Sequence, residues 1–151
     1  MGGAAEPDGR TRGGMPTLSR WFVRSALVCL IAALLLAVLM QWPAASAAAP
    51  WLRVVWPTYL HLLVVGWLTQ LIFGVAYWLF PRYSAASPRG SERLGWASLL
   101  LLNLGLALRI VGEPWAAMGG ETMPLLLGSA TAQLLGGWAF VANTWPRVRQ
   151  R

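Results

Sequence analysis

Hydrophobic residues gather in four long runs, separated by short stretches that contain proline, glycine and charge. The runs cover Ser25–Gln41, Thr58–Phe80, Leu94–Val111 and Met123–Trp145. Each has about 17–23 residues, which as a helix rising about 1.5 Å per residue crosses a hydrocarbon core of about 30 Å. Because backbone groups in lipid must be paired within the segment, the pattern predicts an all-α integral membrane four-helix bundle.

The breaks between the runs carry residues that end helices. Prolines stand in or beside every break, at Pro43, Pro50, Pro57, Pro81, Pro88, Pro114, Pro124 and Pro146. Residues 1–19 are rich in Gly, Pro and Arg and are predicted to be a disordered tail. We therefore expect a transmembrane domain over 20–146 and a short basic tail over 147–151.

Arginines are distributed unevenly between the two sides of this predicted bundle. Ten of the twelve basic residues, all of which are arginine, flank the N-terminus, the second loop and the C-terminus. Positive residues favour the cytoplasmic side, so both termini are predicted to lie inside and the first and third loops outside. Tryptophans at both ends of the runs fit interfacial belts.

The composition limits the function classes. The 151 residues are 57% hydrophobic with a formal net charge of +7, and the arginines stand at the ends of apolar runs. This favours an anionic lipid surface over nucleic acid as the partner. Cys29 is the only cysteine, so an internal disulfide and a CxxC metal motif are excluded.

The first run has a second interpretation. Basic residues, an apolar core and then AASAAA around Ser46 resemble a secretory signal with a cleavage site. The apolar stretch is long for such a signal, so an uncleaved first helix is favoured over cleavage.

Small residues recur at four-residue spacing in two runs. The fourth carries Gly128, Ala132 and Gly136, and the second carries Gly66–Gln70–Gly74, continuing to Tyr77. Such faces allow close helix packing in lipid. Gln70, Asn103 and Gln133 fall near mid-bilayer on different runs, where amides bonding between helices are favoured over a polar path.

His61 is the only histidine and lies about one turn inside the outer end of the second run. At about 100° per residue it shares a side with Val65 and Ile72, roughly opposite the Gly66–Gln70–Gly74 stripe. It is therefore expected to point away from the bundle interior, toward lipid, a flat apolar cofactor or a partner chain. A neutral imidazole with a purely structural role is the alternative.

Two arginines are candidates for a site at the same depth. Arg109 and Glu113 are four residues apart and can pair, and Arg109 shares a predicted inward face with Gly105 and Ser98. Together with Arg53 in the first loop, Arg109 can form an anion clamp beside His61, suited to haem propionates. The alternative is a lone arginine that snorkels to the interface.

The stretch HLLVVGWLTQLIFGVAYWLFPR, His61 to Arg82, resembles the second transmembrane helix of subunit I of haem–copper oxidases and nitric oxide reductases. In that family the helix begins with a histidine that ligates the low-spin haem. The matching positions here are His61, Gly74, Tyr77 with Trp78, and Pro81. The whole chain would then be similar to the first four-helix arc of that subunit, and to short bacterial subunit-I-like and NnrS-like membrane proteins.

The resemblance implies a place in the bacterial inner membrane, association with respiratory electron transfer and haem b bound through His61 as the haem-iron ligand. No copper is expected, because the family's copper-site histidines lie on later helices and no second histidine is present. A sixth haem ligand would come from a homodimer, from a larger respiratory complex, or from Met40, Met118 or Met123.

The chain is not expected to be catalytic alone, since it has no nucleophile–base arrangement, phosphate loop or metal cluster. The alternative function is a non-catalytic scaffold or assembly factor that binds a larger respiratory complex through its small-residue surfaces. A channel or transporter is weaker, because no inverted repeat or acidic ring is evident.

Overall fold

The computed structural model describes residues 14–80 and 90–149, which form helices and connecting turns and contain no strand. Four helical segments are long and apolar enough to cross a membrane: Thr17–Gln41, Trp56–Leu79, Glu92–Ala117 and Met123–Val148. The predicted all-α class and the four candidate membrane spans are thereby confirmed. The cytoplasmic placement of both termini stays a prediction.

The helices follow one another with short connections. The first span is α1 (Thr17–Gln41), and α2 (Pro43–Ala48) and the 3-10 turn η1 (Pro50–Arg53) lead to the second. The second span is composite, with α3 (Trp56–His61), the π-helix η2 (Leu62–Thr69) and α4 (Gln70–Leu79). The third and fourth spans are α5 (Glu92–Ala117) and α6 (Met123–Arg149).

The observed helices are longer than the apolar runs. α1 begins at Thr17 rather than Ser25, because Arg20 and Trp21 are compatible with a helix at a membrane interface. α5 continues through Pro114 and α6 through Pro146. Both prolines stand in the last turn or so, where a proline interrupts one hydrogen bond near the helix end. Of the predicted N-terminal tail, residues 1–13 lie outside the described residues and residues 17–19 belong to α1. Of the predicted C-terminal tail, residues 147–149 belong to α6 and residues 150–151 lie outside the described residues.

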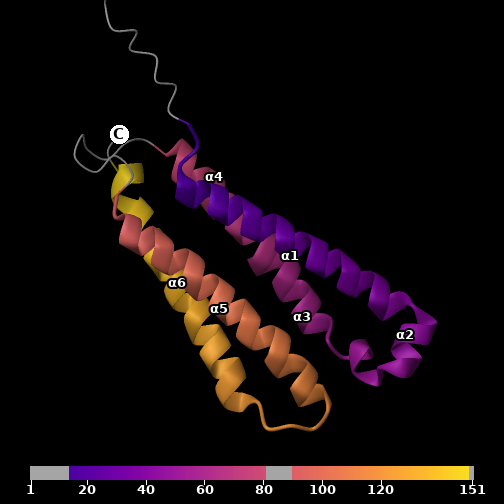
Figure 1. The fold of residues 1–151 in the computed structure, drawn as a ribbon. Coiled ribbons are helices and arrows are strands. Elements are labelled where there is room, and N and C mark those ends of the chain that lie inside the picture. The colour runs from indigo at the N-terminus through magenta and orange to yellow at the C-terminus, as the bar shows by residue number, and fades with distance from the viewer. Residues whose placement is uncertain (1–13, 81–89, 150–151) are drawn as a thin grey trace, which may run out of the picture.

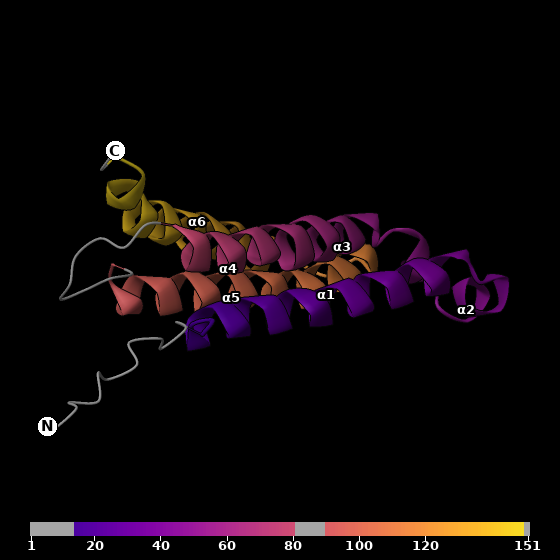
Figure 2. The same ribbon diagram turned by 90° about the horizontal axis from the view of Figure 1, so that it is seen from above.

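The spans form two antiparallel hairpins (Figure 1). One joins α1 to α3, η2 and α4, and the other joins α5 to α6 along nearly their whole lengths. The start of α1 and the end of α6 lie at the same end of the bundle, which we call the terminus end (Figure 2). The other end, with α2 and the α5–α6 connection, is called the loop end.

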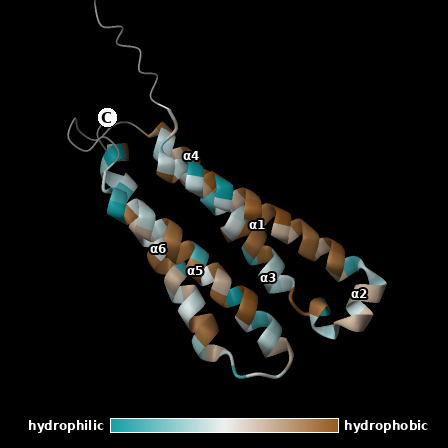
Figure 3. Ribbon diagram, in the orientation of Figure 1, coloured by the Kyte–Doolittle hydropathy of each residue, from teal (hydrophilic) through white to brown (hydrophobic). Residues whose placement is uncertain are grey.

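Large apolar side chains cover the outside of the bundle. Along α1 an exposed face follows the helical repeat, at Val28, Ile31, Leu35 and Val38. Figure 3 shows hydrophobic colour along much of α1 and hydrophilic colour at the C-terminal end of α6. Such an exterior is what lipid contact requires, and in water it would be an unusually large apolar surface.

The predicted small faces lie inside the bundle. Gly66, Gln70, Gly74 and Tyr77 are all buried. A Cβ atom placed on Gly66 would lie 2.7 Å from the Cys29 Cβ. These glycines therefore allow close approach of the second span to α1, as the spacing predicts.

The fourth span uses its small face in the same way. Ala132 and Gly136 are buried against α5, and a Cβ atom on Gly136 would lie 3.0 Å from Leu102 Cγ. Gly128 is half-buried.

α1 is an integral part of the packing. Its inner face, with Phe22, Ala26 and Ala33 almost fully buried, fills the space beside the second span. Removal of α1 as a cleaved signal would uncover Gly66 and Gly74; the uncleaved first helix stays a prediction.

Candidate functional site around His61 and Arg109

His61 ends α3 near the loop end and is half-buried. Its Nδ1 atom lies 2.9 Å from the carbonyl oxygen of Pro57, one turn earlier. When the proton is on Nδ1, the ring donates to this carbonyl and the lone pair is on Nε2. The helix backbone thus orients the ring and defines which nitrogen is available to a ligand.

The π-helix η2 begins directly after His61. Within it the Thr69 hydroxyl donates to the Val64 carbonyl five residues earlier, at 2.9 Å. π-helical turns are rare and are frequent at functional sites, since they alter the direction of side chains along a helix.

The imidazole faces an apolar hollow of about 240 Å³, lined by Leu60, His61, Val64 and Val65. Gly66 and Gln70 are buried on the other side of the helix. The prediction that His61 shares a side with Val65 and points away from the small-residue stripe is confirmed.

Arg109 lies in a polar network between helices. Its Nη1 atom is 2.7 Å from Glu113 Oε1, which confirms the predicted ion pair. The Thr58 hydroxyl of α3 donates to the other Glu113 oxygen, and Arg109 Nε donates to Ser129 of α6 at 3.4 Å. The side chains of Arg109 and Glu113 are only 18% and 9% exposed. The positive charge is therefore balanced inside the protein.

The inward placement of Arg109 is also confirmed. Gly105 and Ser98 are buried on the same face of α5. The Ser129 hydroxyl donates to the Gly105 carbonyl at 2.7 Å, which joins α6 closely to α5 at this level. Arg109 is therefore not a lone arginine, since its charge is paired with Glu113.

Arg53 lies in a different place. It is exposed at the end of η1 and lines a hollow of about 460 Å³ with Met40, Trp56 and Tyr59. The structure therefore places His61, Arg53 and Arg109 near the same end of the bundle but does not bring them into one pocket. The clamp of two arginines beside His61 stays a prediction.

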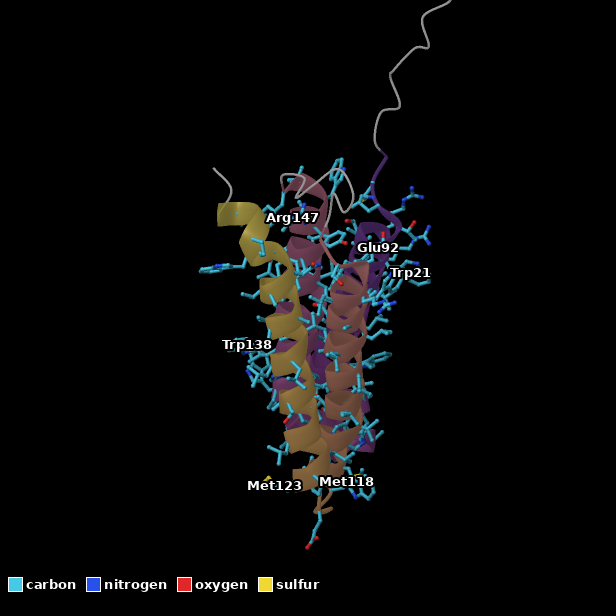
Figure 4. The ribbon with its side chains drawn as sticks, turned by 90° about the vertical axis from the view of Figure 1, so that its left-hand side faces the viewer. Trp21, Glu92, Met118, Met123, Trp138 and Arg147 are labelled. Atoms are coloured by element: carbon cyan, nitrogen blue, oxygen red, sulfur yellow. The ribbon has the colours of Figure 1, made fainter. Side chains whose placement is uncertain are left out.

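The three methionines considered as haem ligands also lie apart from the imidazole. Met118 and Met123 are highly exposed at the loop end (Figure 4), and Met40 lines the Arg53 hollow. None of them lines the His61 hollow.

A second polar group stands at mid-span. Asn103 Nδ2 donates to Gln70 Oε1 at 3.1 Å and to the Leu99 carbonyl at 2.8 Å, and the Ser25 hydroxyl donates to Asn103 Oδ1 at 2.7 Å. The predicted amide bonding between helices is confirmed for Gln70 and Asn103. Gln133 instead bonds Ser129 on its own helix.

Two kinds of polar residue escaped sequence reasoning. Thr58 and Ser129 complete the network around Arg109, although hydroxyls give little signal in a sequence. Arg147, expected in a basic tail, is 2% exposed and donates from Nη2 to the carbonyls of Phe80 at 2.6 Å and Tyr77 at 3.3 Å. Its spacing from Gly136 and Phe140 places it on the buried face of α6, a signal that the sequence does contain.

Comparisons of the chain with models of protein families, with curated proteins and with solved structures find no match. Within residues 14–80 and 90–149, no group of three or more His, Cys, Asp or Glu side chains is placed to hold a metal ion. The interpretation of the site therefore depends on its own geometry.

Proposed function

We propose that this chain is a small multi-pass membrane protein associated with respiratory electron transfer, in which His61 would hold the iron of a haem b. One observation carries the proposal: the carbonyl of Pro57 holds Nδ1, so that Nε2 is left for a ligand at an apolar surface hollow. The similarity of the second span to subunit I of haem–copper oxidases supports the same residue.

The residues around His61 fit one face of such a group. Metal-ligating histidines usually donate their second ring N–H to a backbone carbonyl or carboxylate, as His61 can do here. Leu60, Val64 and Val65 offer an apolar wall to a flat macrocycle. Arg109 is bonded to Glu113 and Ser129, so we assign it to the structure of the bundle rather than to a propionate.

Any further ligand to the iron would come from outside this chain, because no Met, Cys or second His lines the hollow. A symmetric homodimer would present His61 twice, and a larger respiratory complex would supply a different residue. When bound, the haem would supply one-electron redox chemistry, while His61 holds the iron and the apolar wall excludes water.

The test is an absorption spectrum of the full-length protein purified in mild detergent from haem-replete cells. We expect a Soret band that is lost in His61→Ala. Leu68→Ala is the matched control, since Leu68 is exposed on the same span and does not line the hollow. A colourless wild-type protein, or a band that persists unchanged in His61→Ala, would overturn the haem assignment.

A non-catalytic scaffold or assembly factor in the bacterial inner membrane is the second candidate. It is favoured by the way that the polar groups of the spans bond to one another, as Gln70 does with Asn103 and Arg109 with Glu113. Side chains paired in this way are not free to form a polar path for a substrate or for protons.

The small face at Ala132 and Gly136 is used within the α5–α6 hairpin, so a partner would need another surface. Gly137 lies beside the exposed Leu134 and Trp138, and a Cβ atom there would meet nothing within 4 Å. Loss of a co-purifying complex in Gly137→Leu, with an unchanged haem spectrum, would support the scaffold.

A further inference from the structure

A groove runs between α1 and α5 toward the terminus end, away from the His61 site. It has a volume of about 520 Å³, within the range of about 300–1,000 Å³ typical of small-molecule sites. Trp21, Arg24 and Val28 line it from α1, and Trp96, Leu100 and Asn103 line it from α5. Trp21, Val28 and Leu100 are highly exposed, so the groove opens sideways, to the surroundings of the bundle.

Arg24 gives the groove a positive mouth. Its guanidinium carbon lies 5.9 Å from the centre of the Trp21 ring, one turn nearer the terminus end. The side chain therefore extends toward the interface, as a snorkelling arginine does. Among the described residues no carboxylate pairs with Arg24. The acidic residue of this region, Glu92, lines the neighbouring hollow with Arg20 (Figure 4 labels Glu92 and Trp21).

The deeper part of the groove offers no free hydrogen-bonding group to a ligand. Its polar side chains, Ser25 and Asn103, are bonded to each other at 2.7 Å, and the Asn103 amide is bonded to Gln70 and to the Leu99 carbonyl. A hydrocarbon chain that covers them leaves no hydrogen bond unmade, so covering them costs little. A polar headgroup at this depth would find no unused donor among these groups.

We propose that this groove binds one anionic phospholipid, with the phosphate paired to Arg24 and an acyl chain between Val28 and Leu100. Trp21 and Trp96 stand on opposite walls at the level where aromatic rings favour the headgroup region. Charge complementarity selects an anionic lipid, since a cation near a membrane surface attracts acidic headgroups. A free phosphate would match Arg24 but not the apolar length of the groove.

The experiment is native mass spectrometry of the full-length protein in detergent, with phosphatidylglycerol or phosphatidylcholine of identical acyl chains added. We expect one phosphatidylglycerol per chain, held more tightly than phosphatidylcholine. Arg24→Ala should weaken phosphatidylglycerol binding roughly five-fold and remove the preference. Arg53→Ala is the charge-matched control and should leave it unchanged, since Arg53 lines a different hollow.

A second pair of variants tests the groove itself. Leu100→Trp fills the groove and should weaken binding of both lipids, whereas Leu104→Trp should weaken neither, because Leu104 is exposed on the same helix but does not line the groove. Both side chains face outward, so the fold should tolerate them. Equal binding of the two lipids by the wild type, equal effects of Arg24→Ala and Arg53→Ala, or equal effects of the two tryptophans would overturn the proposal. Competition by inorganic phosphate or a protein partner occupying the groove in place of lipid would also overturn it.

Discussion

The packing within each hairpin differs from the packing between the two hairpins. Within them, small residues bring backbones together, as Gly74 does against Phe22 of α1 and Gly136 does against Leu102 of α5. Between them, polar links stand at three levels: Thr58 to Glu113 near the loop end, Gln70 to Asn103 at mid-span, and Arg147 to Phe80 at the terminus end.

This difference in packing follows from the apolar exterior of the bundle, which suits lipid rather than water. In lipid, apolar side chains gain little by meeting each other, so helices associate through close packing and hydrogen bonds. Helices joined by a short loop can pack closely through glycine, as α5 and α6 do. Between the two hairpins, directional polar bonds fix the register. Apolar contacts also join the hairpins: Phe73 and Phe140 stack with ring centres 3.7 Å apart, and Phe22 and Tyr77 pack in one cluster with Leu99 and Leu102.

The largest effect is expected at the loop-end link. Glu113→Leu removes the partner of Arg109 and the acceptor of Thr58. We expect a loss of about 3 kcal/mol in unfolding free energy, the low end for a buried ion pair. The low end applies because Arg109 is 18% exposed. Unfolding in detergent mixtures of rising sodium dodecyl sulfate content measures it.

The double variant Arg109→Leu/Glu113→Leu is the control for this effect. Since the cost arises from an unpaired buried charge, removal of both charges should restore most of the stability. If the double variant is as unstable as Glu113→Leu, the pair acts through its shape and not its charge. The contrast between packing within the hairpins and polar links between them then weakens.

The terminus-end link is expected to be next in size. Arg147 donates to carbonyls at the end of α4 and its guanidinium lies 5.5 Å from the Tyr77 ring centre. A cation there satisfies helix-end carbonyls and complements the helix dipole. Arg147→Met should lose about 2 kcal/mol in the same unfolding assay. Val148→Met, at an exposed neighbour, should change stability little, and equal effects of the two would contradict the role of Arg147.

The close contact between α1 and α4 in the first hairpin is tested by adding one methyl group at Gly74. In Gly74→Ala the new Cβ would lie 2.8 Å from the Phe22 Cβ and 3.2 Å from the Ser19 carbonyl oxygen, so α1 must shift. We expect a loss of about 1 kcal/mol. Gly137→Ala is the matched control, because its Cβ meets nothing within 4 Å, and it should be neutral or slightly stabilising. An unchanged unfolding free energy in Gly74→Ala would show that close approach at Gly74 does not hold α1 and α4 together.

Much of the fold is readable from the sequence because the period of small and polar residues along each span is regular. The stripe at Gly66, Gln70 and Gly74 predicts its own burial, and the spacing of Arg109 and Glu113 predicts their pair. Local periodicity fixes which residues share a face of one helix.

The relation between helices is harder to predict, and the candidate site depends on it. Nothing in the spacing of Thr58 shows that its partner is Glu113, 55 residues later. The sequence predicts that Arg53 and Arg109 have similar depth, but depth does not give the angle of each residue around the bundle. Arg53 lines a hollow beside α1, whereas Arg109 turns toward α6.

The mid-span link gives the smallest expected effect and the most direct test of the comparison. In a double-mutant cycle of Gln70→Leu and Asn103→Leu, we expect a coupling free energy of about 0.6 kcal/mol, the average for hydrogen bonds between membrane helices. It is small because amides in an unfolded but membrane-bound chain also find partners. Gln133→Leu combined with Asn103→Leu is the control cycle and should show no coupling, since Gln133 bonds Ser129 of its own helix. Equal coupling in both cycles would mean that Gln70 and Asn103 do not act as a specific pair, and the register of the hairpins would then depend on the loop-end and terminus-end links alone.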